Sequence, residues 1–323
     1  MQTNEALRAL RGDIPAQHRA QKAMEKVIAD WRSSGLGGVA RDELKRFGEG
    51  AEWKDCPTLV QLIRDHAMAT ALVTPLIEGI AAALRDHPFG HVPFRHQLSD
   101  GVAMLQLIEA GPAVVTLLAY GEEAAVPAPE TVSFSDVERH EIVLSGSADL
   151  RIAELIQETG THAAIDCSPR RVVEGEPMHF PPDIARIAEK IHGQMVVLRV
   201  ARSPLHPRPS RAFRLDDGSL VHRASGDRGE SRREIAMAVL GRMGRHEAAP
   251  LLAELAREGS DHFRWQALRE CIALDSATGF DALTECANTA DDPLAGHAGA
   301  LRAHLLEAYP QLATVQETMA CPA

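Results

Sequence analysis

Apolar residues recur at helical spacing in two blocks that precede residue 88. The first block covers residues 4–32 and ends at SSGLGG, residues 33–38, whose small residues break a helix. The second block covers about residues 57–84, and a proline at position 88 ends it because the residue before a proline avoids the helical region. We therefore expect a helical N-terminal block, residues 1–88.

From about residue 92 to residue 221, the helical spacing gives way to short apolar runs separated by turn residues. The runs are VAMLQLI (102–108), AVVTLLAY (113–120), EIVLSG (141–146), ADLRIAEL (148–155), RRVVEGE (170–176), MVVLRVA (195–201) and AFRL (212–215). Gly146 and Ser147 are read as a turn between two strands, and Asp217-Gly218 predicts a hairpin turn after the last run. Such a series of short strands is typical of a sandwich or a jelly roll.

The C-terminal part returns to helical spacing and contains a repeat. Residues 236–261 align with residues 267–292 at an offset of 31, without a gap. Identical residues recur at 236 and 267, 252 and 283, 254 and 285, 256 and 287, and 261 and 292. A fixed period of about 30 residues that contains two helical patterns predicts stacked helical hairpins.

These three patterns predict an α+β chain with three domains. The predicted domains are a helical block (1–88), an antiparallel β domain (89–225) and a set of helical hairpin repeats (226–323). Only 4% of the residues are aromatic, so we expect cores built from aliphatic side chains.

The C-terminal block, residues 229–309, resembles the short HEAT-like repeats of phycobilisome-lyase-type proteins. The matching residues are Arg233, Ala236, Ala238, Leu240, Gly241, Gly244, Pro250, Leu251 and Leu252. The second copy departs from the pattern, since Asp281 stands where the first copy has proline. The resemblance implies a surface that binds a protein partner and implies no particular chemistry.

The central block, residues 92–222, is similar to the cupin family, whose fold is a double-stranded β-helix. The similarity lies in VERHEIVLSGSADLRI (137–152) and VVEGEPMHFPPD (172–183), where His140, Gly146, Gly175 and His179 fit the family pattern loosely. The family's metal motif contains two histidines one residue apart, and no His-x-His occurs in this chain. The resemblance therefore implies a β domain whose usual metal site is degenerate or absent.

Four histidines lie in the predicted strands, and a barrel-like domain could bring His140 and His179 to one end. Glu141 or Glu174 would then be near, and His192 or His96 would be the third imidazole. Two histidines and one carboxylate are the ligand set of many iron sites, and imidazole also suits zinc, nickel and copper. The candidate metal ligands are therefore His140, His179 and His192, for a divalent metal in the β domain; surface or structural histidines are the alternative.

Arginines also cluster in or near the predicted strands, and they are Arg139, Arg151, Arg170, Arg171 and Arg199. If several of them point inward, they would suit a carboxylate or phosphate ligand, because a guanidinium group binds either in a bidentate way. If they point outward, they are surface charges.

Charge and composition limit the classes of partner that we expect this chain to bind. The net charge is −11, and residues 229–323 are the most acidic part for their length, with 8 Lys and Arg against 14 Asp and Glu. A general nucleic-acid binder needs a basic surface, so this class is excluded. The apolar stretch 67–84 contains two threonines, a proline and a glutamate, so we expect a buried pair of helices and no membrane span.

The cysteines and the N-terminus indicate the compartment. The five cysteines are widely spaced and include no CxxC pair, so neither a zinc site nor a disulfide framework is indicated. The N-terminus has no apolar signal region. We expect a cytoplasmic protein.

In the repeats, Trp265 and Arg269 combine aromatic and basic character on one helix, which is favoured at interfaces, and Glu254 and Glu285 recur at equivalent positions. These four are the candidate partner-binding residues.

The leading hypothesis is a non-catalytic interaction or regulatory protein, whose β domain holds a small ligand and whose repeats bind a protein partner. The alternatives are a metal-dependent cupin-type enzyme and a structural homodimer. No phosphate-binding loop and no GxSxG nucleophile motif occurs.

Overall fold

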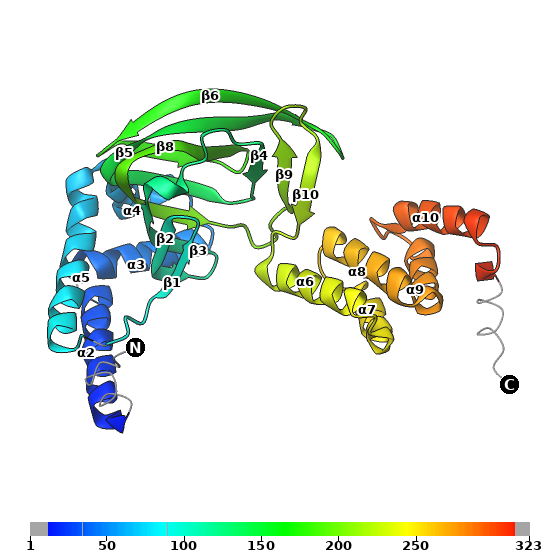
Figure 1. The fold of residues 1–323 in the computed structure, drawn as a ribbon, viewed down its shortest axis with the longest axis horizontal. Coiled ribbons are helices and arrows are strands. Elements are labelled where there is room, and N and C mark those ends of the chain that lie inside the picture. Colours follow the sequence, from blue (N-terminus) through cyan, green and yellow to red (C-terminus); the bar gives the residue numbers. More distant parts are fainter. Residues whose placement is uncertain (1–11, 34, 89, 314–323) are drawn as a thin grey trace, which may run out of the picture. The chain divides into compact units, whose positions relative to one another are not determined.

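A computed structural model describes residues 12–33, 35–88 and 90–313. The order of elements is helices, then an antiparallel β domain, then helices, which confirms the predicted α+β class (Figure 1). The chain forms two compact units: unit 1 comprises the residues up to 205 together with 213–220, and unit 2 comprises 206–212 and the residues from 221 onward. The domain boundaries at 88 and 225 stay a prediction.

Unit 1 begins with helices α2 (Ile14–Ser33), α3 (Gly35–Gly48), α4 (Pro57–Arg64) and α5 (His66–Asp86), and a short 3-10 helix, η1 (Trp53–Asp55), precedes α4. Helix α3 was not predicted. It begins inside the predicted break at 33–38, whose residues 35–38 are helical, and Ala40, Leu44 and Phe47 give it a buried face of its own.

Carboxylate side chains accept hydrogen bonds from the first turns of α5 and α4. Asp65 accepts hydrogen bonds from the backbone N–H groups of Ala67 and Met68 at the start of α5. The buried Glu43 of α3 accepts from the Thr58 hydroxyl at 2.9 Å and from Leu59 N at 3.1 Å, which ties α3 to the first turn of α4.

Helix α5 is long and apolar enough to cross a membrane by length and composition, and it is the one such helix among the described residues. Its buried residues are Ala69, Leu72, Val73, Leu76 and Ile80, which pack in the core of unit 1. The stretch 67–84, for which we expected a buried pair of helices, lies within this single helix, and 28% of its apolar window is buried. A core helix passes the same test of length and composition.

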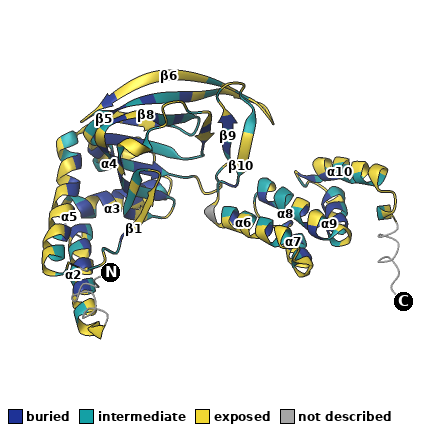
Figure 2. Cartoon of the chain, in the orientation of Figure 1, coloured by how far each residue is buried: buried dark blue, intermediate teal, exposed yellow. Residues whose placement is uncertain are grey.

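A seven-stranded antiparallel sheet follows the helices, in the order β1-β2-β3-β8-β5-β6, with β7 paired to β5. The strands are β1 (Arg95–Ser99), β2 (Val102–Ala110), β3 (Ala113–Tyr120), β5 (Glu138–Glu158), β6 (Ala163–Val173), β7 (Pro177–Phe180) and β8 (Ile184–Arg202). Three further strands, β4 (Thr131–Phe134), β9 (Ser210–Arg214) and β10 (Leu220–Ala224), form a second sheet in the order β10-β9-β4. Strand β6 lies at the edge of the first sheet and is mostly exposed (Figure 2).

The predicted turn at Gly146 and Ser147 is wrong, because β5 runs through both residues as one strand of 21 residues. Gly146 has a φ of 82° and lies beside a register shift, so it forms an irregularity within the strand. A Cβ atom at this position would lie 1.9 Å from the carbonyl oxygen of Gln194 on β8, which is why glycine is required. The hairpin predicted at Asp217-Gly218 does connect β9 and β10.

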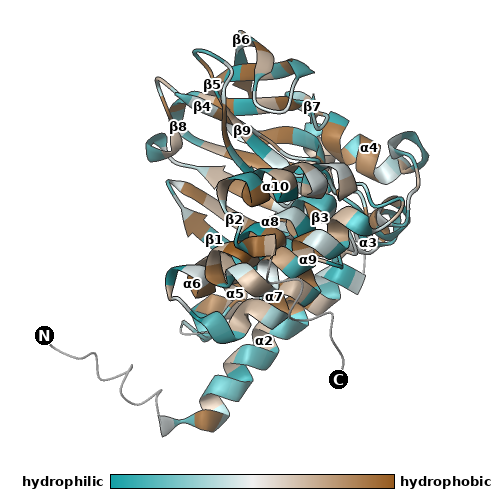
Figure 3. Cartoon of the chain, turned by 90° about the vertical axis from the view of Figure 1, so that its right-hand side faces the viewer, coloured by the Kyte–Doolittle hydropathy of each residue, from teal (hydrophilic) through white to brown (hydrophobic). Residues whose placement is uncertain are grey.

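The main sheet separates two apolar cores. Ile142, Leu198 and Val200 pack with the N-terminal helices, whereas Val143 and Val197 pack with Phe180 on the opposite face. This follows from the alternation of side chains along a strand. Figure 3 shows that the strands of this sheet carry both hydrophobic residues, in brown, and hydrophilic ones, in teal. Neighbouring residues of β5 therefore lie in different environments.

Unit 2 contains helices α6 (Arg228–Arg242), α7 (Ala249–Leu255), α8 (Asp261–Leu274), α9 (Ser276–Asn288) and α10 (Ala295–Ala308), with a short 3-10 helix, η3 (His246–Ala248), before α7. Helix α8 packs on α6, α7 and α9, and α10 packs on α9. The repeated leucines Leu252 and Leu283 are both buried in this core. The predicted helices are thus confirmed, while the HEAT-like resemblance stays a prediction.

Candidate metal site at Glu138, His140 and His179

Strand pairing brings two of the predicted metal ligands together. In the register of β5 and β7, His140 lies directly opposite His179. Glu138 precedes His140 by two residues and therefore points to the same face of β5. One ligand atom from each of the three residues lies within 4.8 Å of the others.

The imidazole of His140 is held in a stack of three rings. The Trp53 ring lies parallel to it, with ring centroids 3.6 Å apart and an interplanar angle of 3°. The His179 ring covers the other side, at 4.4 Å and 11°. The His140 side chain is only 7% exposed, whereas that of His179 is 53% exposed. The site thus has a fixed inner imidazole and an outer one that solvent reaches.

Glu138 is held by hydrogen bonds on both carboxylate oxygens. Oε1 accepts from Nε2 of His140 at 2.9 Å, and Oε2 accepts from Nη2 of Arg202 at 2.9 Å. Arg202 also donates to the backbone carbonyls of Phe47 and Ala51, which fixes its position. Because a carboxylate only accepts, Nε2 of His140 carries the proton in this arrangement.

The pKa shifts at the site favour a carboxylate beside a neutral outer imidazole. The hydrogen bond from His140 lowers the pKa of Glu138, in spite of its burial, and Arg202 lowers it further. Burial lowers the pKa of His179, and the charge of His140 acts in the same direction. At neutral pH the outer imidazole therefore has a lone pair free for a metal ion or a proton.

The donor set fits a divalent transition metal, but the stacked arrangement must open to bind one. Such an ion lies about 2.0–2.1 Å from an imidazole nitrogen, in the plane of the ring. Two rings stacked at 11° have nearly parallel planes, so one ion cannot lie in both. His140 is clamped between Trp53 and Glu138, whereas the exposed ring of His179 has room to turn.

The other predicted ligands lie elsewhere. Nε2 of His192 bonds to Asp149 at 3.0 Å, and Nδ1 of His96 bonds to the carbonyl of Phe94 at 3.0 Å. Glu174 lies 3.8 Å from His66, and Glu141 points to the opposite face of β5 from His140. The structure thus brings Glu138 to the two histidines, and it does not bring His192, His96, Glu141 or Glu174 to them.

The sequence reasoning missed Glu138 and Trp53. Glu138 could have been found, since a residue two positions before a strand histidine shares its face. Trp53 could not have been found in this way, because no spacing rule relates η1 to β5.

The predicted partner-binding residues are all on unit 2. Arg269 and Glu254 are exposed, whereas Trp265 is half-buried against the core and meets the edge of the His297 ring at 6.3 Å. Glu285 is exposed but binds Arg257 of the same chain through two hydrogen bonds. A charge reversal at Glu285 would therefore break an internal contact, so Glu254 is the cleaner position for a binding test.

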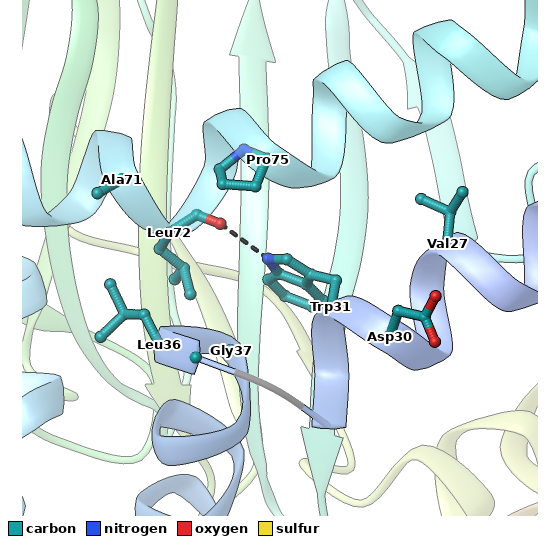
Figure 4. A pocket seen from close by; sticks show the side chains of 9 residues that line it. Val27, Asp30, Trp31, Leu36, Gly37, Ala71, Leu72 and Pro75 are labelled. Carbon is teal, nitrogen blue, oxygen red and sulfur yellow. Dashed lines mark hydrogen bonds between the residues drawn. The ribbon is translucent and has the colours of Figure 1, made fainter.

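A cavity of about 410 Å³ lies between α2, α3 and α5 (Figure 4). Trp31 forms one wall, where its indole N–H donates to the carbonyl of Leu72 at 2.8 Å. Most of the other lining residues are apolar or glycine, and Asp30 is the charged one. The lining includes none of Glu138, His140 and His179, so this cavity and the metal site are separate features.

No protein-family model matches the chain, and comparison with curated proteins found no match. Among solved structures, the chain is similar to the capsular polysaccharide assembling protein CapF from Staphylococcus aureus, with 13% identity over 50% of this chain and 42% of CapF and a TM-score of 0.26. HutD from Pseudomonas fluorescens matches with 15% identity, 35% and 58% coverage and a TM-score of 0.24. KdgF from Halomonas matches with 11% identity, 34% and 88% coverage and a TM-score of 0.25.

The matched segments span about two fifths of CapF and less than two thirds of HutD. TM-scores of 0.24 to 0.26 do not assign the β domain to a fold family. The cupin-like resemblance therefore stays a prediction from the sequence.

Proposed function

We propose that this protein is a metal-responsive interaction protein, whose β domain binds a divalent transition-metal ion through Glu138, His140 and His179. The observation that carries the proposal is the approach of these three ligand atoms to within 4.8 Å of one another. One carboxylate and two imidazoles are a donor set that zinc, iron and nickel accept.

The ring stack supports a regulatory role more than a catalytic one. His179 must leave the stack to bind a metal in the plane of its ring, and this uncovers one face of His140. The other face of His140 rests on Trp53, which lies between α3 and α4. Metal binding in the β domain would therefore change a contact with the N-terminal helices directly.

The metal-dependent enzyme remains the alternative for the same residues. A facial set of two histidines and one carboxylate leaves positions open for substrate. An enzyme also needs a substrate-sized cavity beside the ion. The cavities of about 410 and 360 Å³ are lined by other residues, so a substrate bound beside the ion is the observation that would favour the enzyme.

The first test is metal binding by the untagged, full-length protein after treatment with a chelator. We expect about one equivalent of Zn²⁺ to bind, and His179→Gln, which removes the exposed ligand, to weaken binding about 100-fold or more. Glu138→Gln should weaken it as well, because it removes the only carboxylate of the group.

His192→Gln is the matched control, since His192 is a histidine of the same sheet that bonds to Asp149 outside the group. It should bind Zn²⁺ like the wild type. Failure of the wild-type protein to bind metal, or equal losses in His179→Gln and His192→Gln, would contradict the proposal.

A second candidate function, self-association, is favoured by the surface of α6. Ile235 and Val239 of α6 and Met243, the C-cap residue directly after it, follow one another at four-residue spacing, and their exposed fractions are 64%, 47% and 60%. Such a stripe on one helix face is typical of a contact surface. The exposed Arg232 and Arg242 flank it, whereas residues 246–323 contain 4 Lys and Arg against 12 Asp and Glu. A second copy of the chain therefore offers the complementary charge.

Light scattering on the full-length protein tests this candidate. We expect a dimer mass for the wild type and a monomer mass for Met243→Asp, because a charge within the stripe opposes its burial. Ile156→Asp on β5 is the control, since Ile156 is equally exposed but lies in unit 1. A wild-type monomer at tens of micromolar protein would exclude self-association.

A further inference from the structure

The face of β5 opposite to His140 carries a buried cluster of charges. Glu141 is fully buried, and it accepts a hydrogen bond from Nε of Arg186 at 2.9 Å and from Nε of Arg199 at 2.6 Å. Arg186 also donates to the hydroxyl of Tyr120 at 2.7 Å. Arg139 lies two residues before Glu141 and points to the same face.

The curvature of the long strands brings these residues together. Arg199 is the direct cross-strand neighbour of Glu141 on β8. Arg186 lies at the other end of β8, where it pairs with Ile152, eleven residues along β5 from Glu141. Only a strongly curved pair of strands places both arginines on one carboxylate, so the cluster lies inside the concave face of the sheet.

The positive charge in this cluster exceeds the negative charge. Three guanidinium groups surround one carboxylate, and the side chains of Arg186 and Arg199 are 7% and 21% exposed. Arg139 forms no ion pair in the described chain, and its Nη2 donates only to the carbonyl of Ile184 at 2.8 Å. Two positive charges are thus left without a counter-charge in a largely buried place, which is unfavourable unless an anion is bound.

An unused donor points to the same conclusion. Nε of Arg139 is buried and has no hydrogen-bond partner. Buried donors without a partner are rare, and each one calls for an explanation such as a bound group. Burial lowers the pKa of Arg139 to about 10, and the charge of Arg199 acts in the same direction. Arg139 and Arg199 both lie on the face of the sheet that carries Glu141, because Arg139 precedes Glu141 by two residues and Arg199 is its cross-strand neighbour.

We propose that Arg139, Arg186 and Arg199 form a binding site for a small doubly charged oxyanion, either a dicarboxylate or a phosphate. Arginine binds both through paired N–H donors, and a dianion would balance the two excess charges. The rings of Phe180 and Tyr120 beside Arg139 and Arg186 add an apolar wall that suits the carbon skeleton of an organic acid. The site is independent of the metal proposal, since it lies on the other face of the sheet.

The test is binding of succinate and of inorganic phosphate to the full-length protein at constant ionic strength, measured by calorimetry and by the thermal unfolding midpoint. We expect saturable binding of at least one of them and weaker binding of acetate, which carries a single charge. Arg139→Gln should weaken binding about tenfold or more, since it removes a charged donor without touching the bonds of Glu141. Tighter binding of succinate would indicate an organic acid as the ligand, and tighter binding of inorganic phosphate would indicate a phosphate.

Two control variants keep the result interpretable. Arg151→Gln changes another arginine of β5, which pairs with Glu189 outside the cluster, and should bind the anion like the wild type. Arg95→Gln changes a second arginine-lined cavity of about 360 Å³, formed with Arg32 and Arg41, and should also leave binding unchanged. Circular dichroism confirms that each variant is folded.

Three outcomes would overturn the proposal. The first is the absence of saturable binding of either dianion at millimolar concentration. The second is equal binding by the wild type and Arg139→Gln. The third is a loss confined to Arg95→Gln, which would place the anion in the other cavity.

Discussion

Replacing Glu141 with glutamine is expected to lower the free energy of unfolding of unit 1 by about 3–5 kcal/mol, the usual cost of removing one partner of a buried ion pair. Burial alone would raise the pKa of Glu141, but Arg186 and Arg199 lower it to about 2, so it is the charged form that the fold uses. Glutamine would leave three guanidinium groups without a carboxylate. Chemical denaturation followed by circular dichroism measures the change.

Glu154→Gln is the matched control for this variant. Glu154 lies on the same strand and is exposed, so its replacement should change the free energy of unfolding by less than about 0.5 kcal/mol. A decrease in the free energy of unfolding of less than about 1 kcal/mol in Glu141→Gln would show that the arginines do not depend on this carboxylate. The excess of positive charge would then no longer support an anion site.

The second large effect is expected in unit 2. Glu230→Ala should lower the free energy of unfolding of this unit by about 3 kcal/mol, because it leaves several hydrogen-bond donors without an acceptor. Glu230 is buried and accepts from the hydroxyl of Ser225 at 2.6 Å, from Ser260 N at 2.7 Å and from the Ser260 hydroxyl at 2.6 Å. Ser260 is also the N-cap of α8. One carboxylate thus joins the first turn of α6 to the start of α8.

Hydrogen exchange followed by mass spectrometry measures this effect, because it assigns the loss of protection to individual peptides. We expect faster exchange in Glu230→Ala across α6 and α8, with the sheet of unit 1 unchanged. Glu258→Ala, an exposed glutamate of the same unit, should exchange like the wild type. Equal exchange in Glu230→Ala and the wild type would mean that Glu230 does not hold the two helices together.

The predictable part of the fold is the part that periodicity determines. The hydrophobic spacing predicts the α+β class and the helices of the repeat region, and both are confirmed. The turn reading at Gly146 was wrong because a glycine in a strand marks a bulge as readily as a turn, and only the close approach of Gln194 distinguishes the two. Helix α6 begins after Asp227, whose side chain caps it by accepting a hydrogen bond from the backbone N–H of Glu230.

The candidate sites show a similar limit. His140 and His179 lie in neighbouring strands, so an antiparallel sheet can pair them, and the structure does pair them. The arginines were listed from the predicted strands, yet Arg186 was missed because it reaches Glu141 only through the curvature of β5 and β8. Contacts of this kind depend on how a sheet closes, which no local pattern encodes.

The most direct test of the metal site is a crystal structure of the protein grown with Zn²⁺, with anomalous data collected at the zinc edge. We predict one peak, about 2.0–2.1 Å from an imidazole nitrogen of both His140 and His179 and bound to Glu138, with the His179 ring turned out of the stack. A peak at His192 and Asp149 in its place, or an intact stack of Trp53, His140 and His179 with no peak beside it, would contradict the account.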